Sequence, residues 1–321
     1  MTDKSGFLYL SDAALNGLGI TTTDVVDKIE AALLAKADGQ LWTAPKSAVM
    51  PGDGRYMMST LAAADHPGVI AVKSVMVAPK NPARGLPGIN GAILILDSET
   101  GILKAVLDAN WVTAVRTAAL SAVVARRLAD PGSAIVAFVG CGVQAQSHLS
   151  AFAELFPLRE IRAVGRGQAK VDALCAAARG IGLMARAAPA QEALDGADLV
   201  VSSITLDYSV EPFLDARWLK PGAFAAITDL AIPWAPDGMA AFGTVIIDDR
   251  VQESESARAM VDPALVAGDL TELVSGKVTA SFAPGERSAF VFRGIAVGDF
   301  ALAALAYERA VALGRGTLVT S

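Results

Sequence analysis

The chain has few of the side chains that bind metals or carry redox chemistry. Among its 321 residues are only two cysteines and two histidines. Cys141 and Cys175 form no CxxC pair, and His66 and His148 lie far apart in the sequence. The sequence therefore predicts no zinc site and no other metal site, and we interpret both cysteines as small packing residues.

Long apolar runs and basic clusters are also missing. No run approaches the roughly 18 residues that would span a bilayer, and the N-terminal stretch is acidic and interrupted too early for a signal peptide. We therefore expect a cytoplasmic protein with no membrane segment. A net charge of −6 without a basic cluster argues against nucleic acid as a partner.

What is present is typical of a globular protein with a large core. Apolar residues make up 53% of the chain and charged residues 19%, and the 29 glycines are spread along its length. A chain of this length most often forms two domains.

The first third of the chain has the pattern of an antiparallel sheet. Several strands follow one another without intervening helices, and the last two are joined by a turn at Asp97–Gly101. A capped amphipathic helix, with Thr23 or Asp24 near its start, precedes them, and a long helix follows. The expected helices are 22–38 and about 110–128, and the expected strands are 54–62, 68–78, 91–97 and the segment after the turn.

From residue 134 onward, strands alternate with helices. The expected strands are 134–139, 160–165, 183–187 and 198–204, and the helices between them are 143–156, 168–180 and 189–195. Two further strand segments follow, AFAAITDL at 223–230 and TVIIDD at 244–249. This alternation is typical of a parallel, doubly wound sheet, so the predicted fold class is α/β. An apolar-striped helix at 299–314 follows this part and is expected to pack on the N-terminal sheet. The first domain would then comprise residues 1–118 and 297–321, and the second residues 119–296.

The most informative segment is AIVAFVGCGVQA, from Ala134 to Ala145. A buried strand ends in Gly140 and Gly142, and a helix begins at Val143 and Gln144. Glycines allow a sharp turn and the close approach of a pyrophosphate, the small Ala145 allows tight helix packing, and the helix N-terminus offers free N–H groups. The pattern predicts a dinucleotide site. The alternative is an ordinary strand-to-helix turn made of small residues.

The residue that follows the second strand of this part bears on the choice of cofactor. An acidic residue there binds the ribose hydroxyls of NAD, but this strand ends in Ala-Val-Gly-Arg-Gly, with Arg166 in that place. A guanidinium suits the 2′-phosphate of NADP(H). We therefore favour NADP(H), with NAD(H) possible. In the alternative interpretation, Arg166 is a solvated residue that stacks on adenine.

Several segments together resemble the ornithine cyclodeaminase/mu-crystallin family. They are VIAVKSV, NPARGLP, LDSETG, LDANWVTAVRTAALSAVVARRLA, VGCGVQAQSH, ADLVVSSITL and WLKPGAF. The resemblance implies a homodimer whose N-terminal domain, completed by the C-terminal helix, carries the dimer interface and binds substrate. It implies a Rossmann domain for the cofactor, and an active site in the cleft between the two domains. In the enzymes of this family, a hydride moves between nicotinamide and the α-carbon of an amino acid or its imine.

The resemblance assigns three cations to the substrate. Arg116 matches an arginine that binds the substrate carboxylate, and it lies in an apolar run where an unpaired charge would be costly. Lys73, within a strand of valines and alanines, matches a lysine beside that carboxylate and is a candidate for proton transfer. Lys46 stands where the family usually has a second carboxylate-binding arginine. For each, the alternative is a solvated surface cation.

Further positions follow from the same resemblance. Asp229 falls at or next to the catalytic aspartate of the cyclodeaminases, although a carboxylate at a strand end can also simply cap a turn. Ala296 replaces a glycine of the family and is expected to narrow the substrate pocket. We also assign Met58 to the substrate. The expected cofactor contacts are Ser203 and Thr205 at the end of the 198–204 strand, Thr117, Arg166 and the turn residues Gly140, Gly142, Val143, Gln144 and Ala145.

Three functions remain open on the sequence. The favoured one is an NAD(P)H-dependent oxidoreductase that reduces a small α-imino acid of the ketimine or pyrroline-2-carboxylate type, or works in reverse as an amino-acid dehydrogenase. The second is an ornithine or lysine cyclodeaminase that releases ammonia. The third is a protein that holds NADPH and a ligand without significant turnover. The atypical Lys46, Ala296 and AIPW stretch argue against a strict transfer of ornithine specificity.

Overall fold

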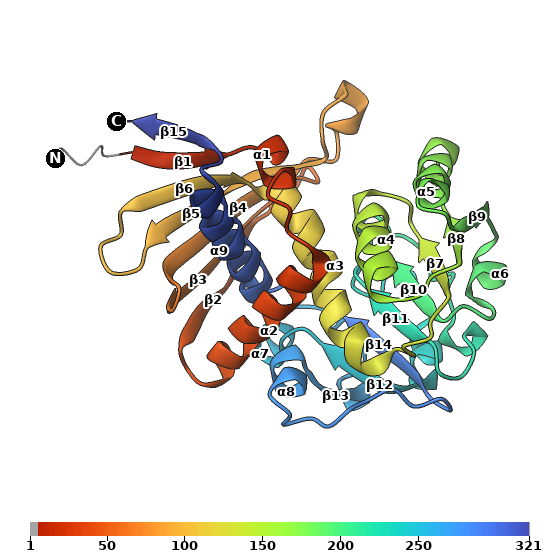
Figure 1. Ribbon diagram of the computed structural model, residues 1–321. Coiled ribbons are helices and arrows are strands. Elements are labelled where there is room, and N and C mark those ends of the chain that lie inside the picture. The colour runs from red at the N-terminus through yellow and green to blue at the C-terminus, as the bar shows by residue number, and fades with distance from the viewer. Residues whose placement is uncertain (1–5, 321) are drawn as a thin grey trace. The chain divides into compact units, whose positions relative to one another are not determined.

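The computed structural model describes residues 6–320, so the first five residues of the acidic N-terminal stretch lie outside it. The predicted α/β fold class is confirmed. The chain folds as two compact units: unit 1 comprises the residues up to 116 and those from 295 onward, and unit 2 comprises residues 117–294 (Figure 1).

Unit 1 is built on a seven-stranded sheet in the order β15-β1-β6-β5-β4-β3-β2. Neighbouring strands are antiparallel except β1 and β6, which are parallel. The turn predicted at Asp97–Gly101 joins β5 to β6, and the N–H of Gly101 donates to the carbonyl of Asp97. The strands are β1 Gly6–Leu10, β2 Leu41–Val49, β3 Tyr56–Asp65, β4 Gly68–Val77, β5 Ile89–Asp97, β6 Leu103–Asp108 and β15 Thr317–Thr320.

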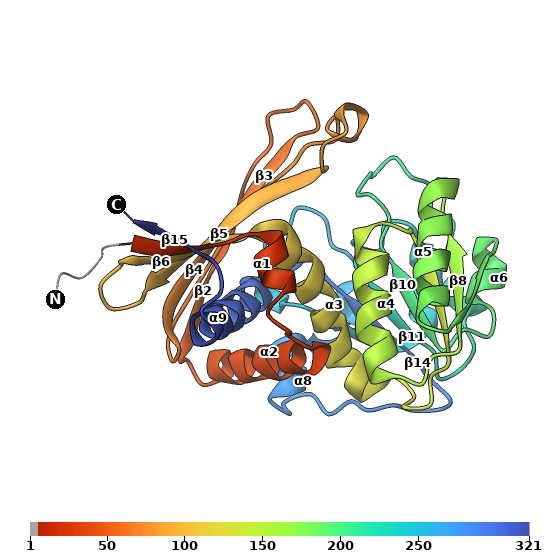
Figure 2. The same ribbon diagram turned by 45° about the horizontal axis from the view of Figure 1, so that its top comes forward.

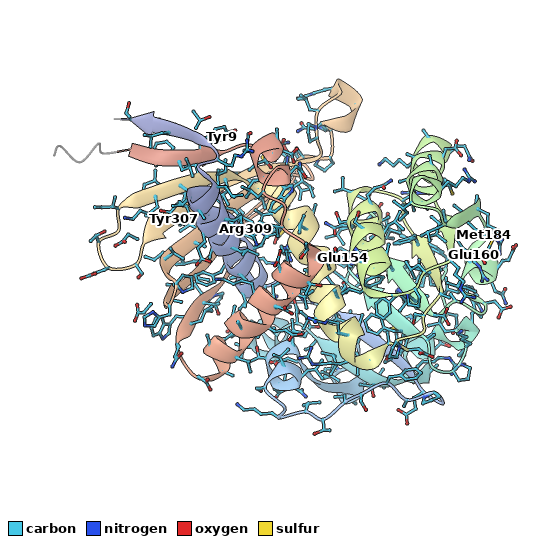
Figure 3. All side chains as sticks on the ribbon, in the orientation of Figure 1. Tyr9, Glu154, Glu160, Met184, Tyr307 and Arg309 are labelled. Atoms are coloured by element: carbon cyan, nitrogen blue, oxygen red, sulfur yellow. The ribbon has the colours of Figure 1, made fainter. Side chains whose placement is uncertain are left out.

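Two helices, α2 (Thr22–Ala37) and α9 (Ala296–Leu313), lie side by side on one face of this sheet (Figure 2). Ion pairs join them at their surface: Lys28 Nζ lies 2.9 Å from Glu308 Oε2, and Arg309, marked on α9 in Figure 3, pairs with Asp24 at 3.5 Å. The C-terminal helix with its apolar stripe therefore packs on the N-terminal sheet, as predicted. Unit 1 also contains α1 (Asp12–Asn16), the 3-10 helix η1 (Pro82–Arg84) and residues 109–116 of α3 (Ala109–Leu128).

Unit 2 contains an eight-stranded sheet in the order β13-β12-β14-β11-β10-β7-β8-β9. All neighbouring pairs are parallel, as expected for strands that alternate with helices. The strands are β7 Ile135–Val139, β8 Glu160–Val164, β9 Met184–Ala187, β10 Leu199–Ser202, β11 Phe224–Ile227, β12 Phe242–Ile247, β13 Val266–Asp269 and β14 Arg287–Val291. The helices are α4 Val143–Leu155, α5 Gln168–Gly180, α6 Ala190–Leu194, α7 Arg250–Ser254, α8 Leu270–Val274 and the rest of α3, with 3-10 helices η2 Ala216–Trp218, η3 Pro236–Ala241 and η4 Pro263–Leu265.

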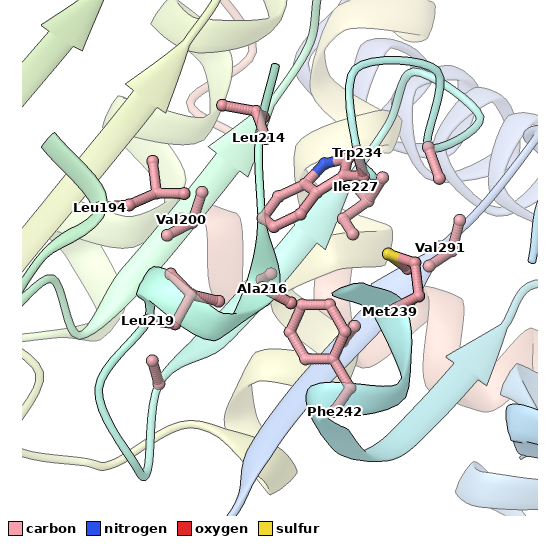
Figure 4. Close-up of a cluster of buried hydrophobic side chains, with 14 of the residues drawn as sticks. Leu194, Val200, Leu214, Ala216, Leu219, Ile227, Trp234, Met239, Phe242 and Val291 are labelled. Atoms are coloured by element: carbon pink, nitrogen blue, oxygen red, sulfur yellow. The ribbon is translucent and has the colours of Figure 1, made fainter. Parts of the chain in front are cut away.

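A large apolar cluster packs against one face of the central strands of unit 2 (Figure 4). Trp234 is its largest side chain and is almost fully buried, with its ring centroid 5.8 Å from that of Phe242. Val200, Ile227 and Val291 contribute from β10, β11 and β14. This cluster fixes the segment that follows β11, which carries Asp229.

Some local predictions were confirmed and others were wrong. The predicted cap of α2 is present, with Thr21 as the N-cap and Asp24 in the first turn: the Thr21 hydroxyl accepts from Asp24 N–H, and the Asp24 side chain accepts from Thr21 N–H, a reciprocal capping box. The C-terminal helix begins at Ala296, three residues before its predicted start at residue 299. The predicted strand 54–62 is β3, shifted to 56–65. Five strands were not predicted: β2, where Pro45 interrupts the alternation, and the short β1, β13, β14 and β15.

Two kinds of feature are absent from the described residues: membrane-spanning helices and metal-binding groups of side chains. Between residues 6 and 320, no helix combines the length and apolar character needed to cross a membrane. Over the same range, no three His, Cys, Asp or Glu side chains are grouped so that they could hold a metal ion.

Candidate functional site

Unit 1 buries a lysine on the inward face of its sheet. In β4, the residues at 71, 73 and 75 face the helices, so Lys73 stands in line with the buried Ala71 and Val75. Only 1% of Lys73 is exposed. The interpretation of Lys73 as an outward-facing surface residue is therefore wrong.

An arginine and an aspartate meet Lys73. Arg116, near the middle of α3, is 5% exposed, and Asp299, in the first turn of α9, is 3% exposed. Lys73 Nζ lies 2.6 Å from Asp299 Oδ2, and Arg116 Nε lies 3.0 Å from Asp299 Oδ1. Thr60, opposite Lys73 in β3, donates its hydroxyl to Asp299 Oδ2 at 3.0 Å.

This buried cluster, Lys73, Arg116, Asp299 and Thr60, carries two positive charges and one negative charge. Within the described chain, Nη1 of Arg116 is buried and has no hydrogen-bond partner. A buried donor without a partner is destabilising, more so when it is charged. One further anion placed against Nη1 would pair this donor and balance the net charge of the cluster.

The electrostatics of the cluster are strongly perturbed. Burial lowers the pKa of Lys73 to about 8; Asp299 opposes this effect, and Arg116 and Lys46 add to it. Burial alone would raise the pKa of Asp299, but Lys73 and Arg116 outweigh it and hold that pKa below its usual value. Lys73 is thus mostly protonated at neutral pH but close to its titration range.

Other residues assigned to the substrate also lie in unit 1. Lys46 is half-buried where the pairing of β2 with β3 shifts register, and its charge acts on Lys73. Met58 lies two residues before Thr60 in β3, on the same face of the sheet. Ala296 is buried at the start of α9, one helical turn before Asp299.

In unit 2, the predicted glycine turn joins β7 to α4. Gly140 has a φ of +92°, and a Cβ placed on it would lie 2.5 Å from the carbonyl oxygen of Ser203, so only glycine fits. A Cβ on Gly142, in contrast, would meet no atom within 4 Å.

The start of α4 is open as well. Gly142 is its N-cap, and no side chain caps the helix. Val143 is 67% exposed, Gln144 follows it in the first turn, and Ala145 is fully buried against the sheet. A helix N-terminus of this kind presents unpaired N–H groups and a positive dipole end, which fits the pyrophosphate of a dinucleotide.

The remaining cofactor candidates have different surroundings. Arg166 is exposed, two residues beyond the end of β8. Ser203 donates its hydroxyl to the carbonyl of Gly140 at 3.4 Å, and Thr205 is exposed in the segment that follows β10. Thr117 is buried in α3, where its carbonyl accepts from Ser121. Ser203 and Thr205 therefore lie after the strand, not at its end, because β10 stops at Ser202.

Two other titratable groups near the turn are held inert by burial. Burial lowers the pKa of His148 to about 4, so its ring is neutral at physiological pH, and Nε2 lies 2.9 Å from the Ser121 hydroxyl oxygen. Burial raises the pKa of the Cys141 thiol to about 11. Neither is suited to acid-base or nucleophilic chemistry.

Asp229 belongs to a second buried polar cluster, in unit 2. It follows β11 by two residues and is 0% exposed. Oδ1 accepts from the Ser202 hydroxyl at 2.9 Å, and Oδ2 accepts from the N–H of Ile204 at 3.1 Å. Trp234 Nε1 in turn donates to the Ser202 hydroxyl at 2.9 Å. Burial raises the pKa of Asp229 to about 7, although its hydrogen bonds to Ile204 and Ser202 oppose the shift.

Sequence reasoning missed two members of the buried cluster of unit 1. Asp299 was assigned only to a helix with an apolar stripe, and Thr60 to a strand. One signal was available for Asp299: it is the only charged residue among the first eleven of that helix, from Ala296 to Ala306.

The sequence matches the ornithine cyclodeaminase/mu-crystallin family over residues 13–314. The ketimine reductase mu-crystallin of Mus musculus is 32% identical over 227 residues, which cover 70% of each chain. Among solved structures, the Δ1-pyrroline-2-carboxylate reductase of Thermococcus litoralis, in complex with NADH and L-proline, superposes with a TM-score of 0.88 at 23% identity, over 98% of this chain and 100% of that one. A lysine cyclodeaminase structure described for the recognition of L-lysine, L-ornithine and L-2,4-diaminobutyric acid has a TM-score of 0.85 at 23% identity, over 98% and 96% of the chains. The last two likenesses concern the fold.

Proposed function

Because the chain belongs to the ornithine cyclodeaminase/mu-crystallin family, we propose that it is a nicotinamide-dependent oxidoreductase that reduces the C=N bond of a small α-imino acid. Ketimines and cyclic imines of the pyrroline-2-carboxylate type are the proposed substrates. The reverse reaction is that of an amino-acid dehydrogenase.

The observation that carries this proposal is the surplus positive charge buried in unit 1. Lys73 and Arg116 share a single carboxylate, and Arg116 Nη1 has no partner between residues 6 and 320. A substrate carboxylate supplies the missing negative charge and accepts the free N–H. An α-imino acid carries this group next to the carbon that is reduced.

The chain's residues divide the reaction between binding and proton control. Arg116 and Lys73 hold the carboxylate, and Lys46 strengthens the positive potential beside them. The Gly140–Ala145 turn and the start of α4 hold the pyrophosphate of the cofactor. A nicotinamide cofactor, when bound, would supply the imine carbon with a hydride, that is, one hydrogen together with two electrons. The imine nitrogen gains a proton, for which Lys73 is the candidate donor because its pKa of about 8 lies near neutrality.

The surroundings of Asp229 favour reduction over cyclodeamination. In a cyclodeaminase, an aspartate in this region would take a proton from the substrate amine. Asp229 has no exposed surface, and both its oxygens accept hydrogen bonds from within unit 2. We therefore propose that Asp229 positions the segment that begins at Ile204 and takes no part in proton transfer to the substrate.

For the cofactor, we propose a preference for NADP(H). Arg166 is exposed at the place where an acidic residue would select NAD. Its guanidinium can pair with the 2′-phosphate. NAD(H) lacks that phosphate and gains nothing from the arginine.

We also propose a homodimer formed through the outer face of the unit 1 sheet. Leu61, Val72 and Leu94 are paired across β3, β4 and β5, and Leu61 and Leu94 are exposed. An apolar row of this kind, in which two of the three side chains are exposed, is typical of a subunit interface. Light scattering should give a dimer for the wild type and a monomer for Leu61→Lys. The control is Val251→Lys, at an exposed apolar position in unit 2, which should remain dimeric.

The enzymatic proposal is tested by nicotinamide absorbance. Purified protein is mixed with NADPH or NADH and a panel of Δ1-pyrroline-2-carboxylate, Δ1-piperideine-2-carboxylate, and keto acids with ammonia or methylamine. We expect oxidation of NADPH with at least one imine. Ammonia release from ornithine or lysine with catalytic NAD⁺, without imine reduction, would make the protein a cyclodeaminase. Cofactor binding without either reaction would leave a ligand-binding protein.

A further inference from the structure

Asp299 contacts three elements of unit 1 through a single carboxylate. From the first turn of α9, Oδ2 meets Lys73 of β4 at 2.6 Å and Thr60 of β3 at 3.0 Å, and Oδ1 meets Arg116 of α3 at 3.0 Å. The side chain is 3% exposed. Asp299 therefore links Lys73 and Arg116, the two proposed substrate-binding cations, to α9, the helix that packs on the sheet.

The two cations would repel each other without this carboxylate. Lys73 and Arg116 each lie within 3.0 Å of Asp299, so both charges share one small buried volume. In such a place an isolated charge is strongly disfavoured, and a lysine loses its proton more readily than an arginine. Asp299 thus decides whether Lys73 is charged when the substrate arrives.

We propose that Asp299 is a positioning residue for the proposed reaction. It holds Lys73 Nζ and the Arg116 guanidinium in place, keeps Lys73 protonated, and leaves one positive charge for one substrate carboxylate. This inference rests on the proposed function. In it, Asp299 sets the highest pH at which Lys73 stays protonated and the substrate carboxylate is bound.

The groups that affect the pKa of Lys73 come from the elements of unit 1 that pack around it. Asp299 favours its protonated form, whereas Arg116 on α3 and Lys46 on β2 disfavour it, as does burial. Its partners in the neighbouring strands are uncharged: Thr60 in β3 and Ile93 in β5. Asp299 is therefore the one anion of this group, and its removal must lower the pKa of Lys73 below the present value of about 8.

The direct test is the titration of Lys73 in Asp299→Asn. Lysine labelled with ¹³C at Cε is followed by NMR, with Lys73→Arg to assign the signal. We expect the Lys73 transition to move to lower pH by about one unit or more, the usual effect of losing an adjacent opposite charge. Thr60→Val removes only the hydroxyl that donates to Asp299 and leaves the carboxylate beside Lys73, so it should not move the transition to lower pH.

Ligand binding gives the second readout. Pyrrole-2-carboxylate, a stable planar analogue of a cyclic imine with its carboxylate, should bind best when Lys73 is protonated, so its Kd should rise as the pH increases through about 8. In Asp299→Asn this rise should begin at lower pH, with a Kd at least about tenfold higher at neutral pH. Asp299→Glu should restore part of the affinity.

The matched control is Glu308→Gln. Glu308 also lies on α9 and forms an ion pair, with Lys28 at the surface, so the variant removes one negative charge from the same helix. The Lys73 titration should remain that of the wild type. If Asp299→Asn is poorly folded, Asp299→Glu, which keeps the charge but moves it, supplies the comparison through the Kd.

The outcomes separate this inference from the proposed function. A folded Asp299→Asn variant with an unchanged Lys73 titration and an unchanged pH limit would overturn the positioning role, even if imine reduction is observed. A lowered Lys73 pKa in a protein that reduces no imine would support the positioning role and refute the proposed reaction.

Discussion

The two units each bury a polar cluster around an aspartate, and the clusters differ in how completely they are satisfied. In unit 2, each oxygen of Asp229 accepts a hydrogen bond, and Trp234 in turn donates to Ser202. In unit 1, Asp299 faces two cations, and Arg116 Nη1 has no partner within residues 6–320. One cluster is closed, and the other has an excess of donors and of positive charge.

This difference distinguishes a cluster that stabilises the fold, in unit 2, from a cluster that can bind a ligand, in unit 1. A buried polar network with every group paired stabilises one conformation, whereas a buried charge left over is destabilising unless a ligand compensates it. The same contrast recurs in the glycine turn, where the space beside Gly140 is filled and the space beside Gly142 is open. Open positions in both units are those we assign to ligands.

The largest expected effect comes from removing the unsatisfied cation. Arg116→Met should lower kcat/KM for the imine substrate by about a thousandfold, because the substrate carboxylate loses both the free N–H of Nη1 and the buried positive charge that faces it. The variant should retain its fold, since methionine fills the apolar surroundings. Arg126→Met, at the exposed end of the same helix, is the control and should keep wild-type kinetics. Equal losses in both variants would contradict the assignment.

Substitutions at Gly140 and Gly142 test the difference between a position with no free space and one with open space beside it. Gly140→Ala forces a Cβ to within 2.5 Å of a backbone carbonyl at a φ of +92° and should destabilise the protein by about 3 kcal/mol. Gly142→Ala meets no neighbour within 4 Å and should leave the melting temperature unchanged while weakening cofactor affinity. Thermal unfolding and a fluorescence titration with NADPH measure the two effects. A Gly142→Ala variant with normal affinity would remove this turn from the cofactor site.

Asp229→Asn tests the closed cluster through the pH dependence of stability. Burial raises the folded-state pKa of Asp229 to about 7, whereas the unfolded chain releases the proton near 3.8. Wild-type stability from this group is therefore highest below that lower value and falls as the pH rises towards 7. The asparagine variant lacks this loss, so from pH 4 to 7 its unfolding free energy should gain on the wild type by about 3 kcal/mol. Parallel curves from denaturant unfolding across that range would show that Asp229 does not titrate in this way.

The smallest expected effect concerns the exposed Arg166. Replacing it with serine should raise the Kd for NADPH about tenfold and leave that for NADH nearly unchanged, because one solvent-exposed pairing with the 2′-phosphate is lost. Arg179→Ser, in the last turn of the helix that follows, is the control. An equal change for both cofactors would indicate stacking on adenine instead.

The sequence predicted features that depend on local patterns and missed those that depend on distant pairings. Alternating valines and alanines around Lys73 place it on an inward face, and the glycine turn follows from its flanking strand and helix. Asp299 was missed because its partners Thr60 and Lys73 lie more than 200 residues away in the chain. Local periodicity shows that a residue is buried, but it does not identify the residue from another element that neutralises it.

Asp229 illustrates the opposite case. The resemblance pointed to a catalytic aspartate, and the position at a strand end fitted that role. What the sequence did not contain was the hydrogen bonding of both oxygens, which depends on Ser202 and Ile204 of the adjacent β10 region. A residue's chemical type is visible in the sequence, but its accessibility is decided by packing.

The most direct test of the central claim compares a ligand that has the carboxylate with one that lacks its charge. Calorimetric titration with pyrrole-2-carboxylate and with pyrrole-2-carboxamide, in the presence of NADPH, isolates that charge on an otherwise identical ring. The surplus cation in unit 1 predicts binding of the carboxylate with at least about thirtyfold higher affinity, and loss of that advantage in Arg116→Met. Equal affinities for the two compounds in the wild type would contradict the account.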